Sequence, residues 1–81
     1  MTKRQTVTLF TRKGCHLCEK AKEVIKDLQG LIDFNFEELN IEEKDEWTEN
    51  FGLKIPVVMI NGNEVQYGQI DKITISKALS Q

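Results

Sequence analysis

Strong net charge and long apolar runs are both missing from this sequence of 81 residues. Its 13 acidic and 11 basic side chains give a net charge of -2, which offers no electrostatic attraction for nucleic acid or for an anionic membrane surface. No segment approaches the length of a membrane span, and the polar amino terminus lacks the apolar run of a signal peptide. We therefore expect a cytoplasmic protein that binds neither nucleic acid nor a membrane.

Cysteine is scarce too, and the positions of Cys15 and Cys18 argue against a role as a covalent staple. A bond between them closes a very short loop, and stabilisation by a disulfide rises with loop length. A structural zinc site needs four ligands, and the one histidine, His16, lies between the cysteines, where it is poorly placed to join them. We expect no bound metal within the chain and a chemical role for the pair.

The chain has enough apolar residues for one hydrophobic core and is too short for two. Apolar side chains make up 40% of the sequence and charged ones 30%. We expect a single domain over residues 1–81, present as a monomer.

Apolar periodicity predicts seven secondary-structure elements. Strands are expected at residues 6–10, at 32–36, at 56–60 and at 64–67, and helices at 16–29, at 41–51 and after Asp71. The order β-α-β-α-β-β-α indicates an α/β protein with a mixed four-stranded sheet, whose first two strands are parallel and whose faces both carry helices.

Short polar signals mark the ends of several of these elements. Asn40 and Glu43 form a capping-box pattern at the start of the second helix. Asn61-Gly62 suits a tight hairpin turn between the last two strands, and Asp71 is a suitable N-cap for the final helix. Trp47 is interpreted either as a core anchor of the second helix or as an exposed partner contact.

The spacing of the two cysteines suits reversible disulfide chemistry. Both lie where the first predicted strand gives way to a helix, so the first-turn amide groups favour the thiolate form of Cys15. Two α-carbons three residues apart on a helix are roughly 5 to 6 Å apart, within the range of a disulfide. We expect Cys15, at the outer edge of the turn, to attack a substrate disulfide, and Cys18, on the apolar stripe, to resolve the mixed disulfide.

Three side chains next to the pair have both a functional and a plain interpretation. Arg12 and Lys13 either favour the Cys15 thiolate and hold a substrate carboxylate, or belong to an ordinary solvated loop. Protonated His16 would stabilise a neighbouring thiolate and make the disulfide more oxidising, but an exposed polar residue without a specific role is an equally good interpretation.

Three motifs in this order resemble the glutaredoxins of the thioredoxin fold. They are Thr11 to Glu19 with its Gly-Cys-His-Leu-Cys sequence, Lys54 to Val58, and Gly68 to Asp71. The resemblance covers nearly the whole chain and is greatest to the short bacterial glutaredoxin-like proteins with that cysteine motif. It implies a thioredoxin-like fold of the glutaredoxin type.

The resemblance also implies roles for residues away from the cysteines. Pro56 would have a cis peptide bond beside the cysteines, so that the Ile55 backbone can pair with an extended thiol substrate. Taken alone, Pro56 also suits a trans proline that begins an edge strand. Arg12 matches the basic position that contacts a glutathione carboxylate in glutaredoxins.

Agreement with the glutaredoxin pattern is incomplete around the glutathione groove. Gly68 and Asp71 match parts of the turn that receives the other end of glutathione, at a helix amino terminus suited to a carboxylate. Gln69 replaces the second glycine of that turn, His16 the usual proline of the active site, and Leu17 its usual aromatic residue. The fold and the dithiol chemistry therefore carry over better than the identity of the substrate.

The sequence thus predicts a glutaredoxin-like dithiol-disulfide oxidoreductase that exchanges its Cys15-Cys18 pair with a thiol or disulfide substrate. No cofactor is required, and the partner is either glutathione, as a co-substrate, or a protein dithiol or disulfide. The alternative is a metal or iron-sulfur carrier that uses the same pair. Copper and zinc carriers of that kind have a different element order, whereas an iron-sulfur carrier would share a cluster between Cys15 and glutathione from two subunits.

Overall fold

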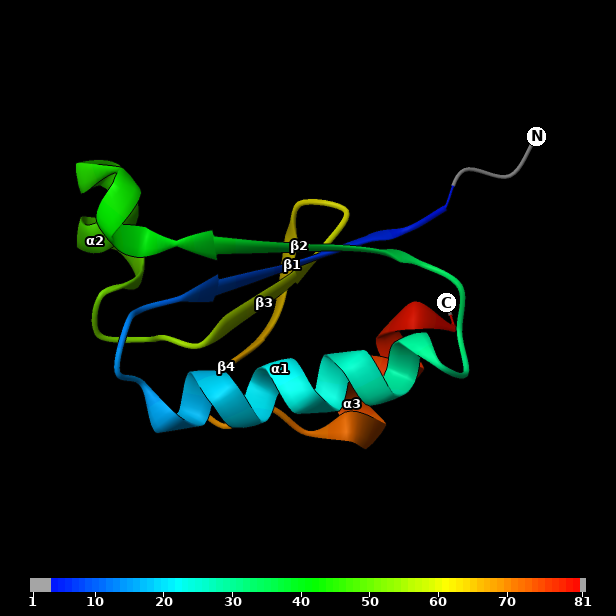
Figure 1. Ribbon diagram of the computed structural model, residues 1–81. Coiled ribbons are helices and arrows are strands. Elements are labelled where there is room, and N and C mark those ends of the chain that lie inside the picture. The colour runs from blue at the N-terminus through cyan, green and yellow to red at the C-terminus, as the bar shows by residue number, and fades with distance from the viewer. Residues whose placement is uncertain (1–3, 81) are drawn as a thin grey trace.

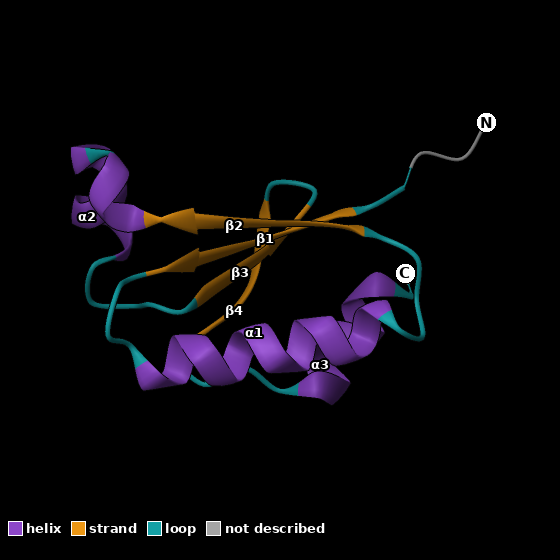
Figure 2. Ribbon diagram, in the orientation of Figure 1, coloured by secondary structure: helices purple, strands orange, loops and turns teal. Residues whose placement is uncertain are grey.

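A computed structural model describes residues 4–80, which form one mixed sheet with helices on both of its faces (Figures 1 and 2). The elements in chain order are β1 (Thr6–Thr11), α1 (His16–Gln29), β2 (Asn35–Asn40), a short 3-10 helix η1 (Ile41–Glu43), α2 (Asp45–Phe51), β3 (Val57–Ile60), β4 (Asn63–Tyr67) and α3 (Lys72–Leu79). Within residues 4–80, no helix is both long and apolar enough to cross a lipid bilayer.

The strands lie in the order β2-β1-β3-β4, with β1 and β2 parallel and the other neighbours antiparallel. This confirms the predicted mixed four-stranded sheet. The register pairs Thr11 with Asn40, and Phe10 with Val57, so β1 and β2 finish where β3 begins. That edge of the sheet, here called the cysteine end, also receives the carboxyl end of β4, because Tyr67 pairs with Val57.

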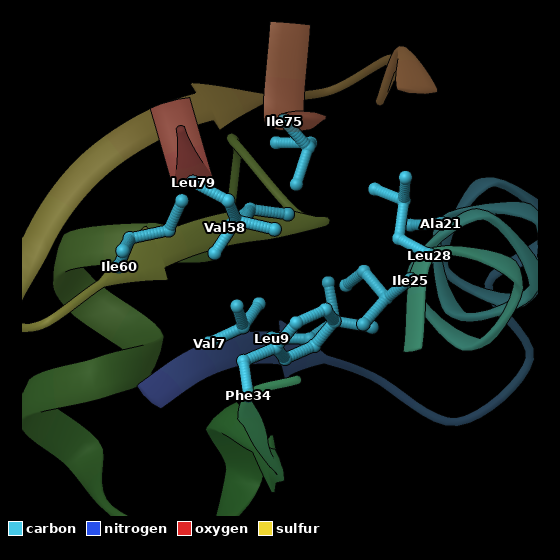
Figure 3. Packing of buried hydrophobic residues seen from close by; sticks show 10 residues of the cluster. All are labelled: Val7, Leu9, Ala21, Ile25, Leu28, Phe34, Val58, Ile60, Ile75 and Leu79. Atoms are coloured by element: carbon cyan, nitrogen blue, oxygen red, sulfur yellow. The ribbon is translucent and has the colours of Figure 1, made fainter. Parts of the chain in front are cut away.

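The larger hydrophobic cluster, here called the main core, lies between the sheet and helices α1 and α3 (Figure 3). Helix α1 contributes Ala21, Ile25 and Leu28, whose spacing of three and four residues produces the single buried stripe that the sequence predicts. The ten buried residues of the main core are Val7, Leu9, Ala21, Ile25, Leu28, Phe34, Val58, Ile60, Ile75 and Leu79.

A smaller cluster, here called the second cluster, lies on the opposite face of the sheet. Its buried residues are Phe10, Ile41 and Val57. Helix α2 covers them with Trp47, whose ring meets that of Phe10 edge-on at 5.3 Å, and with Phe51, which stacks on Phe10 at 4.5 Å. Trp47 is partly buried and packs against this cluster, which favours the core-anchor interpretation, and helices cover both faces of the sheet.

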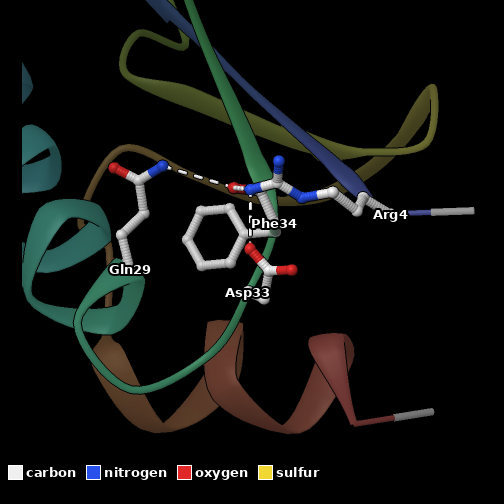
Figure 4. Close-up of polar contacts among 4 residues, drawn as sticks. All are labelled: Arg4, Gln29, Asp33 and Phe34. Carbon is white, nitrogen blue, oxygen red and sulfur yellow. Dashed lines mark hydrogen bonds and ion pairs between the residues drawn. The ribbon is translucent and has the colours of Figure 1, made fainter.

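The second strand begins later than predicted. The alternation of Ile32, Phe34 and Phe36 predicts a strand at 32–36, but β2 begins at Asn35. Phe34 is buried in the main core, and its carbonyl accepts hydrogen bonds from the side chains of Arg4 (3.2 Å) and Gln29 (3.4 Å), with Arg4 also paired to Asp33 (Figure 4). Side chains rather than a neighbouring strand satisfy this carbonyl, so the prediction of a strand at 32–36 is wrong in its bounds.

The second helix is broken where one continuous helix was predicted. Lys44 has an extended backbone, φ -139° and ψ 132°, and separates η1 from α2. On one helix, at roughly 100° per residue, Ile41 and Trp47 would face different directions. The break lets both face the second cluster. The Asn40 side chain caps η1 by accepting from the Glu42 amide at 2.8 Å, so the predicted capping box with Glu43 does not form as such.

The remaining local signals agree with the structure. Asn61 and Gly62 have φ values of 52° and 85°, which a tight turn between antiparallel strands requires. The Asp71 carboxylate caps α3, accepting from the Thr74 amide at 3.0 Å and the Thr74 hydroxyl at 2.9 Å. These bonds, the hydroxyl first, lower the pKa of Asp71 below its ordinary value of 3.8.

Candidate active site

The two cysteines lie at the cysteine end, in the loop between β1 and α1 and in the first turn of that helix. Gly14 has a φ of +81°, a conformation that suits glycine and turns the chain into α1. Cys15 is the N-cap residue, and its sulfur accepts a hydrogen bond from the Cys18 amide at 3.1 Å. The Cys15 sulfur therefore occupies the position at which a helix start stabilises negative charge.

Cys15 and Cys18 form a disulfide in the structure, and their α-carbons are 5.2 Å apart. The two residues differ in burial: Cys15 is half-buried, whereas Cys18 is 4% exposed and lies on the buried side of α1. The outer and inner positions predicted from the sequence are thus the ones that the structure shows. Only Cys15 is readily open to an incoming substrate.

A cleft of about 450 Å³ opens beside the cysteines, on the β2 side. Arg12 and Lys13, predicted from the sequence to contact substrate, both line it. The full lining is Thr11, Arg12, Lys13, Gly14, Cys15, Cys18, Glu19, Lys22, Glu38, Asn40 and Glu43. A volume of this size lies in the range of small-molecule sites.

The far wall of the cleft was missed by sequence reasoning. It consists of Glu38 and Asn40 from β2 and Glu43 from η1. These residues reach the cysteines because β2 lies parallel to β1 with Asn40 opposite Thr11. Side-chain periodicity along β2 gives no indication of this neighbour. The predicted parallel pairing of the first two strands was the one signal that could have identified these wall residues.

Charges of both signs line the cleft. Its basic groups are Arg12, Lys13 and Lys22, and its acidic groups are Glu19, Glu38 and Glu43. Lys22 on α1 and Glu38 on β2, both in the cleft lining, form an ion pair at 3.1 Å. In residues 4–80, no three His, Cys, Asp or Glu side chains are grouped so as to hold a metal ion.

Ile55 and Pro56 lie at the same end of the sheet but do not line the cleft. The Ile55-Pro56 peptide bond is cis, Pro56 is buried, and Ile55 packs against the second cluster. Gly68 has a φ of +78°, and its amide donates to the Pro56 carbonyl at 2.8 Å. This hydrogen bond joins the loop before β3 to the loop after β4, so Pro56 and Gly68, which belong to separate sequence motifs, are neighbours in the structure.

Asp71 and His16 lie outside the cleft lining. The Asp71 amide donates to the Gln66 side chain at 2.7 Å, while its carboxylate caps α3. The His16 side chain is 94% exposed and lies 4.0 Å from the Glu19 carboxylate. The plain interpretation of His16 as an exposed polar residue is compatible with this position.

Known proteins share both the sequence pattern and the fold. A family model described as glutaredoxin-like domain (DUF836) matches residues 6–80. The uncharacterized protein Rv0508 of Mycobacterium tuberculosis is 29% identical over 75 residues, which cover 85% of this chain and 76% of that protein.

Solved structures show the same arrangement of elements. Protein Ne2328 of Nitrosomonas europaea is 25% identical with a TM-score of 0.84, covering 98% of this chain and 95% of that one. Protein XcR50 of X. campestris is also 25% identical, with a TM-score of 0.77 and coverages of 91% and 95%. A thioredoxin from Halobacterium salinarum, 16% identical, shares the fold with a TM-score of 0.72 over 94% of this chain and 72% of that one.

The fold and the Cys-x-x-Cys pair together indicate thiol redox chemistry. Because the family model spans nearly all of the described residues, the chain belongs to the glutaredoxin-like domain family DUF836 and has the thioredoxin fold that its sequence predicts.

Proposed function

We propose that this protein is a cytoplasmic dithiol-disulfide oxidoreductase, with Cys15 as the attacking thiol and Cys18 as the resolving thiol. The observation that carries the proposal is the N-cap position of Cys15, whose sulfur accepts a hydrogen bond from the Cys18 amide. A negatively charged sulfur is stabilised at that position, and thiolate is the reactive form of cysteine. The difference in burial supports the division of roles, because Cys15, the less buried of the two, is the one that a substrate can reach.

The exchange proceeds in two steps that balance in atoms and charge. The Cys15 thiolate attacks one sulfur of a substrate disulfide, a mixed disulfide forms, and the first substrate half leaves as a thiolate. Cys18 then loses its proton to water and attacks the Cys15 sulfur. The bond between Cys15 and the substrate breaks, the Cys15-Cys18 bond forms, and the second half leaves as a thiolate. The substrate is reduced by two electrons and the protein is oxidised by two.

The reduced protein would be regenerated by glutathione or by a protein dithiol. Arg12, which lines the cleft, supports a carboxylate-bearing partner such as glutathione. Asp71, in contrast, uses its carboxylate and amide within the fold, which leaves less of the groove implied by the glutaredoxin resemblance available for a ligand. We propose no further cofactor, and a monomer as the working form.

Single cysteine variants test the proposal. The reduced wild type, Cys15→Ser and Cys18→Ser are each mixed with a pyridyl disulfide, and thiol release is followed by absorbance while adducts are identified by mass spectrometry. We expect release of two equivalents from the wild type, one equivalent and a stable adduct from Cys18→Ser, and little reaction from Cys15→Ser, because serine cannot act as the nucleophile. A Cys15→Ser variant that reacts as fast as the wild type would contradict the assignment.

A glutathione titration followed by amide NMR distinguishes the two partners. Shifts confined to Arg12, Ile55 and the segment from Gly68 to Asp71 are expected if glutathione is the partner. An unchanged spectrum over the same range would favour a protein dithiol.

A further inference from the structure

One ion pair in the lining of the cleft joins α1 to the sheet. Lys22 on α1 lies 3.1 Å from Glu38 on β2, and each side chain is 38% exposed. Both residues line the cleft together with Cys15 and Cys18. As a surface ion pair it would contribute little to stability, about 0 to 1 kcal/mol. Its position beside the cysteines is therefore the more informative property.

Lys22 lies one helical turn after Cys18. Residues four apart share a helix face, and long helical side chains lean toward the amino terminus, which directs the Lys22 side chain toward the turn that holds Cys18. Cys18 is 4% exposed and lines the cleft together with Lys22. A positive charge at this place favours the thiolate form of a cysteine.

The cleft lining holds four other charged residues besides Lys22 and Glu38. Arg12 and Lys13 belong to the loop before Cys15, and Glu19 directly follows Cys18 on α1. Glu43 comes from η1, at the outer end of β2. Lys22 is thus the basic residue of the cleft that lies on α1 together with Cys18, and its ion-pair partner is Glu38.

We propose that Lys22 stabilises the Cys18 thiolate in the resolving step, and that Glu38 both holds Lys22 in place and offsets part of its charge. The inference rests on the proposed function, because it concerns the second of the two exchange steps. In that step Cys18 gives its proton to water, its thiolate attacks the Cys15 sulfur, and the substrate half leaves as a thiolate. Lys22 and Glu38 are positioning residues here, since neither forms nor breaks a bond.

The proposal predicts opposite effects for the two partners of one ion pair. Lys22→Met removes the positive charge, so the Cys18 thiolate becomes less favourable. Glu38→Gln removes the negative charge that offsets Lys22, while glutamine keeps a similar shape, so the thiolate becomes more favourable. If the pair were only a structural link between α1 and β2, both substitutions would break the same contact and act in the same direction.

The pyridyl disulfide reaction separates the steps, and the reagent is uncharged at neutral pH. The fast release of the first equivalent reports attack by Cys15, and the second release reports ring closure by Cys18. Below the titration midpoint of Cys18 we expect the second phase to slow on the order of threefold in Lys22→Met and to quicken by a similar factor in Glu38→Gln. The first phase should change less, and high salt should shrink both effects.

A matched ion pair outside the cleft provides the control. Lys54 and Glu64 lie 2.8 Å apart and are 36% and 35% exposed, close to the values for Lys22 and Glu38, but neither lines the cleft. Lys54→Met and Glu64→Gln should leave the second phase at the wild-type rate.

A second readout does not depend on turnover. In a Cys15→Ser background, the Cys18 thiolate is titrated by its ultraviolet absorbance. Lys22→Met should raise the pKa of Cys18 and Glu38→Gln should lower it. Shifts in the same direction for both variants, or none for either, would overturn the proposal while leaving the proposed function intact. Absence of any wild-type reaction with the disulfide would instead contradict the proposed function.

Discussion

The two hydrophobic clusters on opposite faces of the sheet differ in size and in what lies next to them. The main core contains ten buried residues from two strands, two helices and the loop before β2, whereas the second cluster contains three, covered by the short helix α2. Burial of apolar area is the dominant favourable contribution to folding, so the main core supplies most of the stability.

The buried residues of the second cluster are chain neighbours of residues at the candidate active site. Phe10 is followed by Thr11 and the loop that carries Cys15, and Val57 directly follows Pro56. Ile41 follows Asn40 of the cleft wall. Each buried residue of this cluster is therefore bonded in the chain to a residue of the cleft lining or to Pro56. The comparison suggests that one cluster keeps the chain folded and the other places the reacting groups.

The largest effect is expected in the main core. Ile25 is fully buried there, on the helix that begins at the cysteines. Ile25→Ala should lower the free energy of unfolding by about 2 to 5 kcal/mol, because it removes buried methyl groups and leaves a cavity. Urea denaturation followed by circular dichroism measures the loss.

A matched exposed site controls for the change of residue type. Ile73 on α3 is 64% exposed, so Ile73→Ala should change the unfolding free energy by less than about 0.5 kcal/mol. The folded fraction of Ile25→Ala should still react with a pyridyl disulfide at close to the wild-type rate. A large loss of rate per folded molecule would contradict the view that the main core stabilises the fold without positioning the reacting groups.

A substitution in the second cluster is expected to lower stability less, and activity more, than Ile25→Ala in the main core. Phe10 packs against both Trp47 and Phe51. Phe10→Leu should cost about 1 to 2 kcal/mol, since it removes two aromatic contacts and some buried area. Because Thr11 and the cysteine loop follow directly, the first phase of thiol release should also slow.

Stopped-flow measurement of Phe10→Leu beside Ile25→Ala, both under conditions where the variants are folded, makes the comparison direct. Equal rates per folded molecule would show that the second cluster has no special influence on the site.

The smallest effect concerns the polar edge of the main core. Asp71 caps α3, which contributes Ile75 and Leu79 to that core, and its pKa is lowered mainly by the Thr74 hydroxyl. A lowered pKa means that the carboxylate stabilises the fold fully above the unfolded value of 3.8 and loses this effect as the pH falls through the folded value.

Asp71→Asn keeps a capping side chain but does not titrate. The wild type should therefore melt slightly higher than Asp71→Asn at neutral pH, and the difference should shrink as the pH falls below 3.8. Thermal denaturation across that range measures it. A difference that stays constant with pH would show that the carboxylate charge does not stabilise the helix.

Local signals made much of the fold predictable from the sequence. The helix from His16 to Gln29, the Asn61-Gly62 turn and the Asp71 cap depend on residues close in the chain, and all three agree with the structure. The break at Lys44 depends instead on which distant residues Ile41 and Trp47 must meet. No local propensity determines that.

The candidate site likewise has one part that local sequence predicts and another that depends on strand pairing. The cysteine pair and its difference in burial follow from one helix, so the sequence was sufficient to predict them. The cleft wall comes from β2, whose residues reach the cysteines only through strand pairing. Glu38 illustrates the difficulty, because an acidic residue in a strand otherwise suggests only a solvated position.

The extended backbone at Lys44, between η1 and α2, lets neighbouring residues do two different things: line the cleft and pack against the second cluster. Glu43 and Trp47 are four apart and would share one face of an unbroken helix. With the chain extended at Lys44, Glu43 lines the cleft and Trp47 packs against Phe10. Substitution of Glu43 can therefore change the charge of the cleft wall, by protein engineering or over evolutionary time, while Trp47 keeps its packing against Phe10.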